Sequence, residues 1–512
     1  MTKHRWLAPT TVLVSLGLVA AACGGDNKSG TTATTAGAAA ATTAAAATTA
    51  AAATTAATTA PATTAAAAAA GPVIPGPGTG KYGQDPSNPN LYVGSNGFTL
   101  DVSKCPADWN NNQGITDTQI DMFASYPTSG PLAGFALIYD GMRAYYDYMA
   151  QNGGIDGRKI VLEGKDDQYA PAATKTNSDE ALAANKYAVF DAMLGTPNNL
   201  GIWDDTNREC MPQLMNATGA PQWGDIENHP WTSGAPALNY YSEGGLWVEW
   251  LKQKFPNGAK LVSITFNNDF GNSYTKAIKH YTQGTNLQLV ADFPHDPTAP
   301  NIDNQYTSAA ATGADVILIQ TTGTYCVQLL AALEKGSWHP TVVLSATCQS
   351  KNQFFKPLID QGLTGKDAFT ILYYKDPLDP QWANDPFIKA YKDVTTKAGQ
   401  DPAKTTYFTG WAYAWYTTAI LKEAASYRGG LNRANIALAS HEIQLAAPIL
   451  LPGVTASVSG LKDQYMVESG QMTKYTVTDP KQLGNFVPDG PLINVEGKLG
   501  TFKNIAAAAG GG

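Results

Sequence analysis

Hydroxyl-bearing and small residues fill three loops that follow short apolar runs of the chain. These loops are 125–135 (SYPTSGPLAGF), 195–199 (GTPNN) and 216–221 (NATGAP). If each apolar run is a strand, its loop lies outside the carboxyl end of a sheet, where open α/β folds bind their ligands. Hydroxyl groups and backbone N–H groups at helix starts suit a carboxylate or another small polar group. Each loop alone could be a plain turn, but the three together favour a binding site.

Residues typical of catalysis form no recognisable motif in this chain. No HExxH sequence and no G-x-S-x-G elbow occurs. Asp166 and Asp167 could act as an acid–base pair, but adjacent residues on a strand point to opposite faces. We therefore expect no catalytic residue, no metal site and no cofactor, and an extracellular hydrolase is the weakest of the functions considered.

Four cysteines besides Cys23 lie in the body of the chain, without a CxxC pair or a Cys/His cluster, which argues against a zinc site. An even number in an exported chain favours disulfides, for which three connectivities exist. We favour Cys105–Cys210 and Cys326–Cys348. The second pair lies at two consecutive strand-to-loop boundaries, which a parallel sheet can bring within bridging distance. Buried free thiols are the alternative.

The elements that must position these residues alternate between apolar runs and amphipathic helical stretches, as in βαβ units of a mostly parallel sheet. Two helices are expected at 132–151 and 405–426, and the aromatic residues of the second should pack in the core. Two α/β lobes explain the pattern more simply than one large sheet. The expected strands are 119–125, 159–163, 188–194 and 213–215 in the first series, and 260–266, 288–293, 315–320, 341–345 and 369–374 in the second.

The N-terminus carries the features of an export signal. Residues 1–22 combine a short basic start with an apolar run that is too short to span a membrane. Ala20, Ala21 and Ala22 before Cys23 resemble the lipobox of bacterial lipoproteins, although that motif prefers Leu at the position of Ala20. Cys23 is therefore the expected lipidation site, and the end of an ordinary secretion signal is the alternative.

A low-complexity segment follows this cysteine. Residues 31–70 contain 24 Ala and 14 Thr and have no amphipathic period, so we expect 23–88 to be the lipid anchor and a disordered linker. Composition leaves O-glycosylation of this linker open.

The overall charge excludes one class of partner. The chain has 512 residues with 42 acidic and 34 basic side chains, a formal charge of −8. No basic excess is present to attract phosphates, so we expect no nucleic-acid partner.

Five segments read in order resemble the type I periplasmic binding proteins of the Leu/Ile/Val-binding family. They are the three loops above together with NGGIDGRKIVL (152–162) and DDQYAPAAT (166–174). The resemblance covers residues 118–505 and implies an α/β fold of two doubly wound Rossmann-like lobes joined by a three-strand hinge. It places 118–236 and 376–451 in lobe 1, 237–375 and 452–505 in lobe 2, an N-terminal extension at 89–117 and a flexible tail at 506–512.

The resemblance also implies binding residues in the first lobe. Phe135 falls where the family has an aromatic lid, and Thr196 falls where it has a hydroxyl. In the family, the loops that correspond to 195–199 and 216–221 hold the ligand's α-carboxylate and α-ammonium. Ala217 falls in the loop 216–221. The family's Thr two positions later is Gly219 here, with Thr218 adjacent.

In the second lobe the resemblance puts Phe270 on the ligand's face and a further aromatic near Tyr325. The family's amino-acid binders have an acidic residue in the loop after 341–345, yet this chain reads Ser-Ala-Thr-Cys there, with Thr347 as its polar side chain. A buried ammonium without a carboxylate partner is costly. Either another acid substitutes or the ligand is not an α-amino acid; the candidates are Asp166, Asp167 and Asp225.

The function implied by the resemblance is that of the extracytoplasmic solute-binding component of an ABC importer. It would close two lobes on a small polar solute, such as a branched-chain amino acid or a related amide, urea or carboxylate compound. Its partners would be that solute, a membrane permease and the membrane itself through Cys23. A lipoprotein receptor that senses a ligand and signals to a membrane partner is the alternative, and neighbouring genes would separate the two.

Overall fold

The computed structural model describes residues 80–496 and 502–508. The expected signal peptide, Cys23 and most of the expected linker lie outside the described residues. Two ordered elements extend into regions expected to be irregular: β1 (Gly83–Asp85) lies in the expected linker, and α13 (Phe502–Ala508) enters the expected tail.

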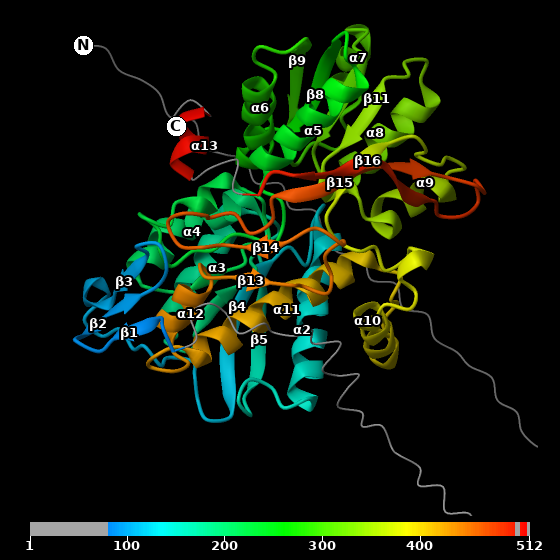
Figure 1. Ribbon diagram of the computed structural model, residues 1–512. Coiled ribbons are helices and arrows are strands. Elements are labelled where there is room, and N and C mark those ends of the chain that lie inside the picture. The colour runs from blue at the N-terminus through cyan, green and yellow to red at the C-terminus, as the bar shows by residue number, and fades with distance from the viewer. Residues whose placement is uncertain (1–79, 497–501, 509–512) are drawn as a thin grey trace, which may run out of the picture. The chain divides into compact units, whose positions relative to one another are not determined.

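The first of two large sheets has four parallel strands in the order β5-β4-β6-β7. They are β4 (Gln119–Tyr126), β5 (Lys159–Asp166), β6 (Val189–Asp191) and β7 (Gln213–Leu214). The helices of this first lobe are α2 (Ala136–Gln151), α3 (Pro171–Ala183), α4 (Thr196–Arg208), α10 (Pro386–Lys397), α11 (Thr405–Ser426) and α12 (Arg433–Ala439). In Figure 1 this lobe lies below the second sheet.

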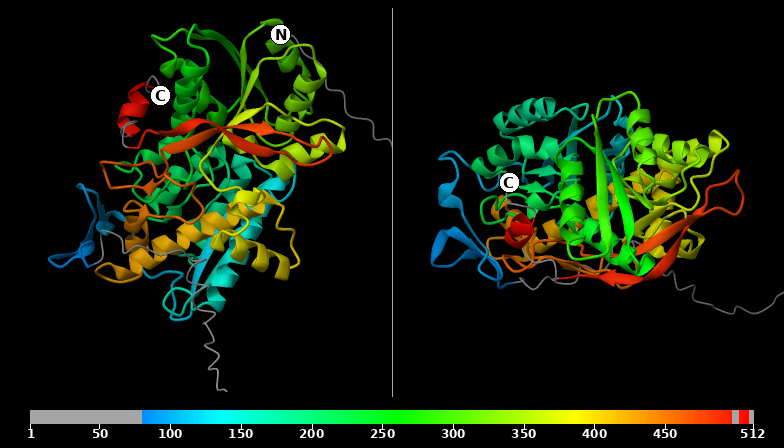
Figure 2. Two further views of the ribbon diagram at one scale, coloured as in Figure 1. Left: turned by 45° about the vertical axis from the view of Figure 1, so that its right-hand side comes forward. Right: turned by 90° about the horizontal axis from the view of Figure 1, so that it is seen from above.

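The second sheet has seven strands in the order β16-β15-β12-β11-β10-β8-β9. The five from β9 to β12 are parallel, and β15 and β16 are added antiparallel at one edge. The strands are β8 (Ala259–Phe266), β9 (Leu287–His295), β10 (Val316–Gln320), β11 (Thr341–Leu344), β12 (Phe369–Leu372), β15 (Ser469–Thr476) and β16 (Asn485–Asn494). The helices of this second lobe are α5 (Tyr240–Lys254), α6 (Asp269–Tyr281), α7 (Asp303–Ala311), α8 (Thr324–Lys335) and α9 (Lys356–Asp360), which cover both faces of the sheet (Figure 2).

Each strand expected from residue 119 to residue 374 is present, with ends that differ by a few residues. The expected helix 405–426 is α11, and most of its residues are buried, including Trp411 and Trp415. A helix that is apolar on all sides belongs in a core, as the aromatic richness of this segment indicated.

Helix α11 lies against α2 (Figure 1), and two glycines allow this close approach. A Cβ at Gly410 would lie 1.9 Å from the carbonyl oxygen of Ile138, and one at Gly141 would lie 2.0 Å from that of Tyr407. Any larger residue would therefore push the two helices apart. This close packing fixes the N-terminal half of α11 against α2.

Three segments connect the lobes. The first precedes α5, where Leu238 pairs with Val467, and the second follows β12, where Tyr374 pairs with Leu450. The third differs from expectation, because 452–467 lies with the first lobe. Within it, β14 (Ala456–Ser457) pairs with β13 (Gln444–Leu445), and the Tyr465 hydroxyl donates to the carbonyl of Pro221 at 2.8 Å. The chain therefore enters the second lobe for the last time near β15, later than Pro452.

A small antiparallel sheet precedes the first lobe. Its strands are β1, β2 (Asn88–Val93) and β3 (Thr99–Asp101). The Cys105–Cys210 disulfide ties the segment that follows this sheet to the end of α4, and the second favoured bridge, Cys326–Cys348, is also present.

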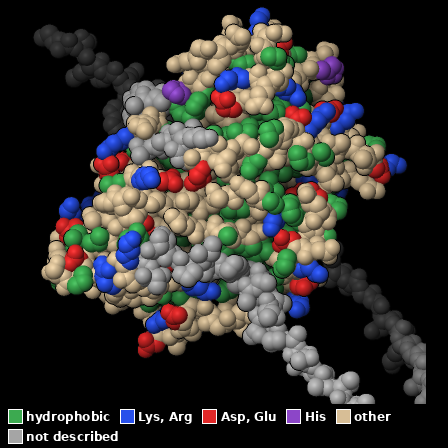
Figure 3. Space-filling view, viewed as in Figure 1, with side chains coloured by type: hydrophobic (Ala, Val, Ile, Leu, Met, Phe, Trp, Pro, Cys, Tyr) green, Lys and Arg blue, Asp and Glu red, His purple; other side chains and the backbone are tan. Residues whose placement is uncertain are grey.

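Charged side chains of both signs lie on the face of the molecule that Figure 3 draws. They are interspersed there, and the described residues of this face form no continuous basic patch. In 80–496 and 502–508, no helix combines the length and the apolar character that a membrane crossing requires.

Candidate functional site

A cavity of about 140 Å³ lies between the two lobes. Its first-lobe wall contains Phe135, Ile138, Leu194, Ala217, Thr218, Gly219, Thr406, Thr409 and Tyr413. Its second-lobe wall contains Tyr240, Glu243, Ala346, Thr347, Gln349, Ser350, Gln353 and Phe354, and the connecting segments add Ala237, Leu238, Tyr373 and Tyr374. An apolar cavity of about 150 Å³ holds benzene, so this one accommodates a small organic molecule.

Five of the residues expected to bind the ligand line this cavity: Phe135, Ala217, Thr218, Gly219 and Thr347. A sixth, Thr196, stands at the start of α4 and is buried behind them. Its hydroxyl shares a hydrogen bond with the hydroxyl of Thr218.

The structure does not bring Phe270 and Tyr325 to the cavity. Phe270 is 3% exposed and packs edge-on against Tyr240, with ring centroids 4.8 Å apart. Tyr325 is also buried, and its hydroxyl donates to the carbonyls of Pro297 and Ala299. Both aromatics therefore support the core of the second lobe, and Tyr240 takes the place at the cavity wall that was expected for Phe270.

Tyr240 links the two lobes at the cavity wall. Its backbone N–H donates to the carbonyl of Gly219 at 2.7 Å, and its hydroxyl lies 3.2 Å from that of Thr218. On the other side, the indole N–H of Trp223 donates to the carbonyl of Thr218 at 3.1 Å. The loop 216–221 is thus held by hydrogen bonds from Tyr240 and from Trp223.

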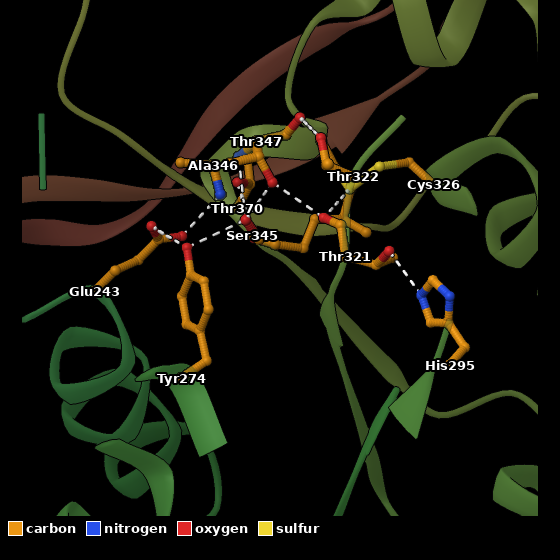
Figure 4. Close-up of a disulfide and its surroundings, with 12 residues drawn as sticks. Glu243, Tyr274, His295, Thr321, Thr322, Cys326, Ser345, Ala346, Thr347 and Thr370 are labelled. Carbon is orange, nitrogen blue, oxygen red and sulfur yellow. Dashed lines mark hydrogen bonds between the residues drawn. A yellow bond between two sulfur atoms is a disulfide. The ribbon is translucent and has the colours of Figure 1, made fainter. Parts of the chain in front are cut away.

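Glu243 is the acidic residue of this site, and it comes from the first turn of α5 rather than from the loop after β11. Its carboxylate accepts hydrogen bonds from the Tyr274 hydroxyl and the Ala346 backbone N–H, both at 2.7 Å (Figure 4). The side chain is almost fully buried, and this burial, opposed by the two hydrogen bonds, raises the pKa of Glu243 to about 7. Near neutral pH the carboxyl group can therefore gain or lose its proton.

None of the three acids proposed as substitutes lines the cavity. Asp166 accepts from the backbone N–H of Thr128 at 2.8 Å, and although burial acts to raise its pKa, hydrogen bonds from Ser129 and neighbouring N–H groups lower it to about 2. The buried Asp167 accepts from the hydroxyls of Ser125 and Thr174. Asp225 accepts from Asn228. These carboxylates hold loops in place.

The loop after β11 is built as a rigid support for Glu243. The Ser345 hydroxyl lies 2.7 Å from that of Thr347, which donates to the carbonyl of Thr321 at 3.0 Å. The Cys326–Cys348 disulfide then ties the end of this loop to α8. Figure 4 shows these groups around the loop. The disulfide therefore helps to hold the Ala346 N–H toward Glu243.

Side chains also bridge the lobes at the far end of the cavity. The Ser350 hydroxyl lies 2.8 Å from that of Thr405, and Thr406 donates to the side chain of Gln353 at 2.7 Å. Residues 350 and 353 belong to the second lobe, whereas 405 and 406 begin α11 of the first. These contacts hold the two lobes together around the cavity.

A separate carboxylate group lies away from this cavity. Oxygens of Asp463, Glu468 and Glu496 lie within 4.8 Å of one another. Carboxylate oxygens are ligands for Ca²⁺ and Mg²⁺, but none of the three residues lines the cavity, so they have no assigned part in binding there.

Comparisons with known proteins agree with this architecture. The periplasmic binding protein family model matches residues 124–466, whereas no curated protein matches the chain. Among solved structures, a fatty acid ABC transporter substrate-binding protein from Thermomonospora curvata is 18% identical with a TM-score of 0.62, covering 75% of this chain and 95% of its own.

Two further structures carry small ligands. A branched-chain amino acid ABC transporter protein from Thermus thermophilus with bound valine is 15% identical with a TM-score of 0.63, over 74% of this chain and 97% of its own. A solute-binding protein from R. palustris in complex with benzoate is 14% identical with a TM-score of 0.59, over 73% of this chain and 98% of its own. At these identities the likeness establishes the fold, and two Rossmann-like lobes are what the chain has.

Proposed function

Because this chain belongs to the periplasmic binding protein family, we propose that it captures one small solute between its lobes and delivers it to an ABC permease. The cavity lined by both lobes is the observation that carries this proposal. A solute that contacts both walls favours the closed arrangement over an open one, and hinge closure is the corresponding motion. The relatives crystallised with valine and benzoate bind molecules of a size that suits a cavity of about 140 Å³.

A thermal-shift screen tests this function. Amino acids, amides, ureas, short-chain acids and aromatic acids are added to the full-length protein, and each solute that raises Tm is recovered and checked by mass spectrometry. A solute at one hundred times its Kd stabilises the folded state by about 2.7 kcal/mol, which is readily detected. Recovery of the solute unchanged supports a binding protein, whereas chemical conversion or the absence of any stabilising solute contradicts the proposal.

A pair of threonine variants locates the solute. Thr218→Val removes a hydroxyl from the cavity wall while keeping the side-chain size, and we expect a loss of affinity of about tenfold, as for a hydrogen bond worth about 1.4 kcal/mol. Thr176→Val is the control, because Thr176 is exposed on α3 and its hydroxyl bonds only to the carbonyl of Ala172. Equal affinities in the two variants would contradict this placement.

We further propose that Cys23 carries the lipid that holds the protein at the outer face of the cell membrane. The support comes from the three alanines and the apolar run that precede it. Cys23→Ser should release the protein into the medium, as followed by immunoblotting of cell and medium fractions. Continued retention of the variant at the membrane would contradict lipidation at this residue.

A further inference from the structure

The charged side chains that line the cavity are of one sign only among the described residues. Among the described residues that line it, Glu243 is the only acid, and Lys, Arg and His are absent. A ligand carboxylate would therefore meet no cationic side chain there. A net positive ligand, in contrast, would find a buried carboxylate, and an ion pair is strengthened where water is excluded.

Aromatic side chains surround the same space. Phe135, Tyr240, Phe354, Tyr373, Tyr374 and Tyr413 all line the cavity. They come from different parts of the chain, so they form several walls and not a single stripe. Aromatic rings attract cations through their quadrupoles, and clusters of such rings are the usual binding sites for alkylated ammonium groups.

The lysines of an adjoining cavity are paired with carboxylates. A smaller cavity that shares Gln349, Ser350, Tyr374 and Thr409 with it contains Lys351 and Lys375. Lys351 pairs with Asp376 and Lys375 with Asp385, both at 2.7 Å. These two ion pairs leave Glu243 as the one carboxylic acid, without a basic partner, among the described residues that line the larger cavity.

We propose that the solute is a small organic cation, an alkylated ammonium compound whose charge faces Glu243 and whose alkyl groups lie among the six aromatic side chains. This inference rests on the proposed solute-binding function and names the chemical class of the ligand. Benzoate-like anions fit less well, because their carboxylate would share the cavity with Glu243 and no Lys, Arg or His of the wall. Valine-like zwitterions fit less well because their ammonium carries no alkyl groups to place among the aromatic rings.

The test uses compounds of matched shape in isothermal titration calorimetry. Choline is compared with 3,3-dimethylbutan-1-ol, in which carbon replaces the charged nitrogen, and with valine and benzoate. Choline is expected to bind at least tenfold more tightly than the neutral alcohol. Equal binding of the two, or no binding of choline, overturns the inference. If valine, benzoate or another solute binds and choline does not, solute binding stands and the cation assignment falls; if no solute binds, both fall.

Variants of the cavity wall test whether its residues cause the difference in affinity between choline and the neutral alcohol. Glu243→Gln should lower choline affinity at least tenfold and leave that of the alcohol unchanged. Glu249→Gln is the control on the same helix, since Glu249 is half exposed and pairs with Lys252, and it should change neither. Tyr413→Phe keeps the ring and should keep the affinity, whereas Tyr413→Leu should lower it several-fold. The two Tyr413 variants test the ligand assignment even if Glu243→Gln fails to fold. Unchanged choline binding in Tyr413→Leu would contradict the placement of the alkyl groups among the aromatic side chains.

The pH dependence gives a further readout. With a pKa of about 7, Glu243 goes from about one tenth to about nine tenths ionised between pH 6 and pH 8, so choline affinity should rise about tenfold. Burial raises the pKa values of the groups that face it, Tyr240, Tyr274 and Tyr373, so these stay protonated in this range. Affinity that is constant or falls over this range overturns the assignment of a cationic ligand to Glu243.

Discussion

Removing each disulfide in turn should separate stability from binding. The two bridges close loops of very different length, with sequence separations of 22 residues for Cys326–Cys348 and 105 for Cys105–Cys210. The entropy lost by the unfolded chain then gives about 3 kcal/mol for the short loop and about 5 kcal/mol for the long one. The double variant Cys105→Ala/Cys210→Ala should therefore be the less stable of the two.

Removal of the short bridge, and not of the long one, should lower the affinity for the solute. The short bridge holds the loop whose Ala346 N–H donates to Glu243 and whose Thr347 lines the cavity. Without it, the solute must order this loop, at a cost of about 1 kcal/mol, which is about a fivefold loss of affinity. The long bridge joins an N-terminal segment that does not line the cavity, so its removal should leave affinity unchanged.

The assay combines urea unfolding, followed by tryptophan fluorescence, with calorimetric titration of the solute found in the screen. Both are carried out on Cys105→Ala/Cys210→Ala and Cys326→Ala/Cys348→Ala under non-reducing conditions. Equal losses of affinity in both variants, or an affinity within twofold of wild type after removal of the short bridge, would refute the role given to the loop after β11.

Three other perturbations test parts of the fold and the contact between the lobes. Burial raises the pKa of Asp191 from 3.8 to about 6, so its ionisation opposes folding as pH rises through this range. Between pH 4 and pH 8 the wild type should lose about 2 kcal/mol relative to Asp191→Asn in urea unfolding. Gly410→Ala places a Cβ against the backbone of α2 and should cost about 3 kcal/mol. Gly201→Ala, whose Cβ would make an ordinary van der Waals contact with Pro171 at 3.7 Å, should be neutral or slightly stabilising. Gln353→Ala removes a hydrogen bond between the lobes and should weaken solute binding several-fold in calorimetry, with unchanged stability; unchanged affinity would mean that this bond does not stabilise the closed form.

The parts of the fold that could be predicted from sequence are those with strong local patterns. The long apolar run of α11 and the β-rich runs of the parallel strands specify their own structure, because burial on all sides demands apolar residues throughout. The antiparallel strands β15 and β16 were missed: Ser469–Thr476 and Asn485–Asn494 are mixed in polarity and join an edge of the sheet only through tertiary pairing. The position of 452–467 likewise depends on its pairing with β13.

The sequence predicts which loop residues line the cavity, but it does not predict which long side chains reach it. Ala217, Thr218 and Gly219 follow a strand directly, so their place at the sheet's edge follows from the chain itself. Glu243 and Tyr240 reach the cavity only because α5 begins where the lobes meet, and no local motif marks them. Phe270 shows the reverse case: a local motif marks it, but its ring packs into the core against Tyr240 and does not line the cavity.

The central claim is that one solute binds between the two lobes, and calorimetric titration of that solute measures this most directly. The account predicts one molecule bound per chain, an affinity reduced about tenfold in Thr218→Val and kept in Thr176→Val, and recovery of the solute unchanged. Binding that is indifferent to Thr218, or a solute that is consumed during the titration, would contradict it.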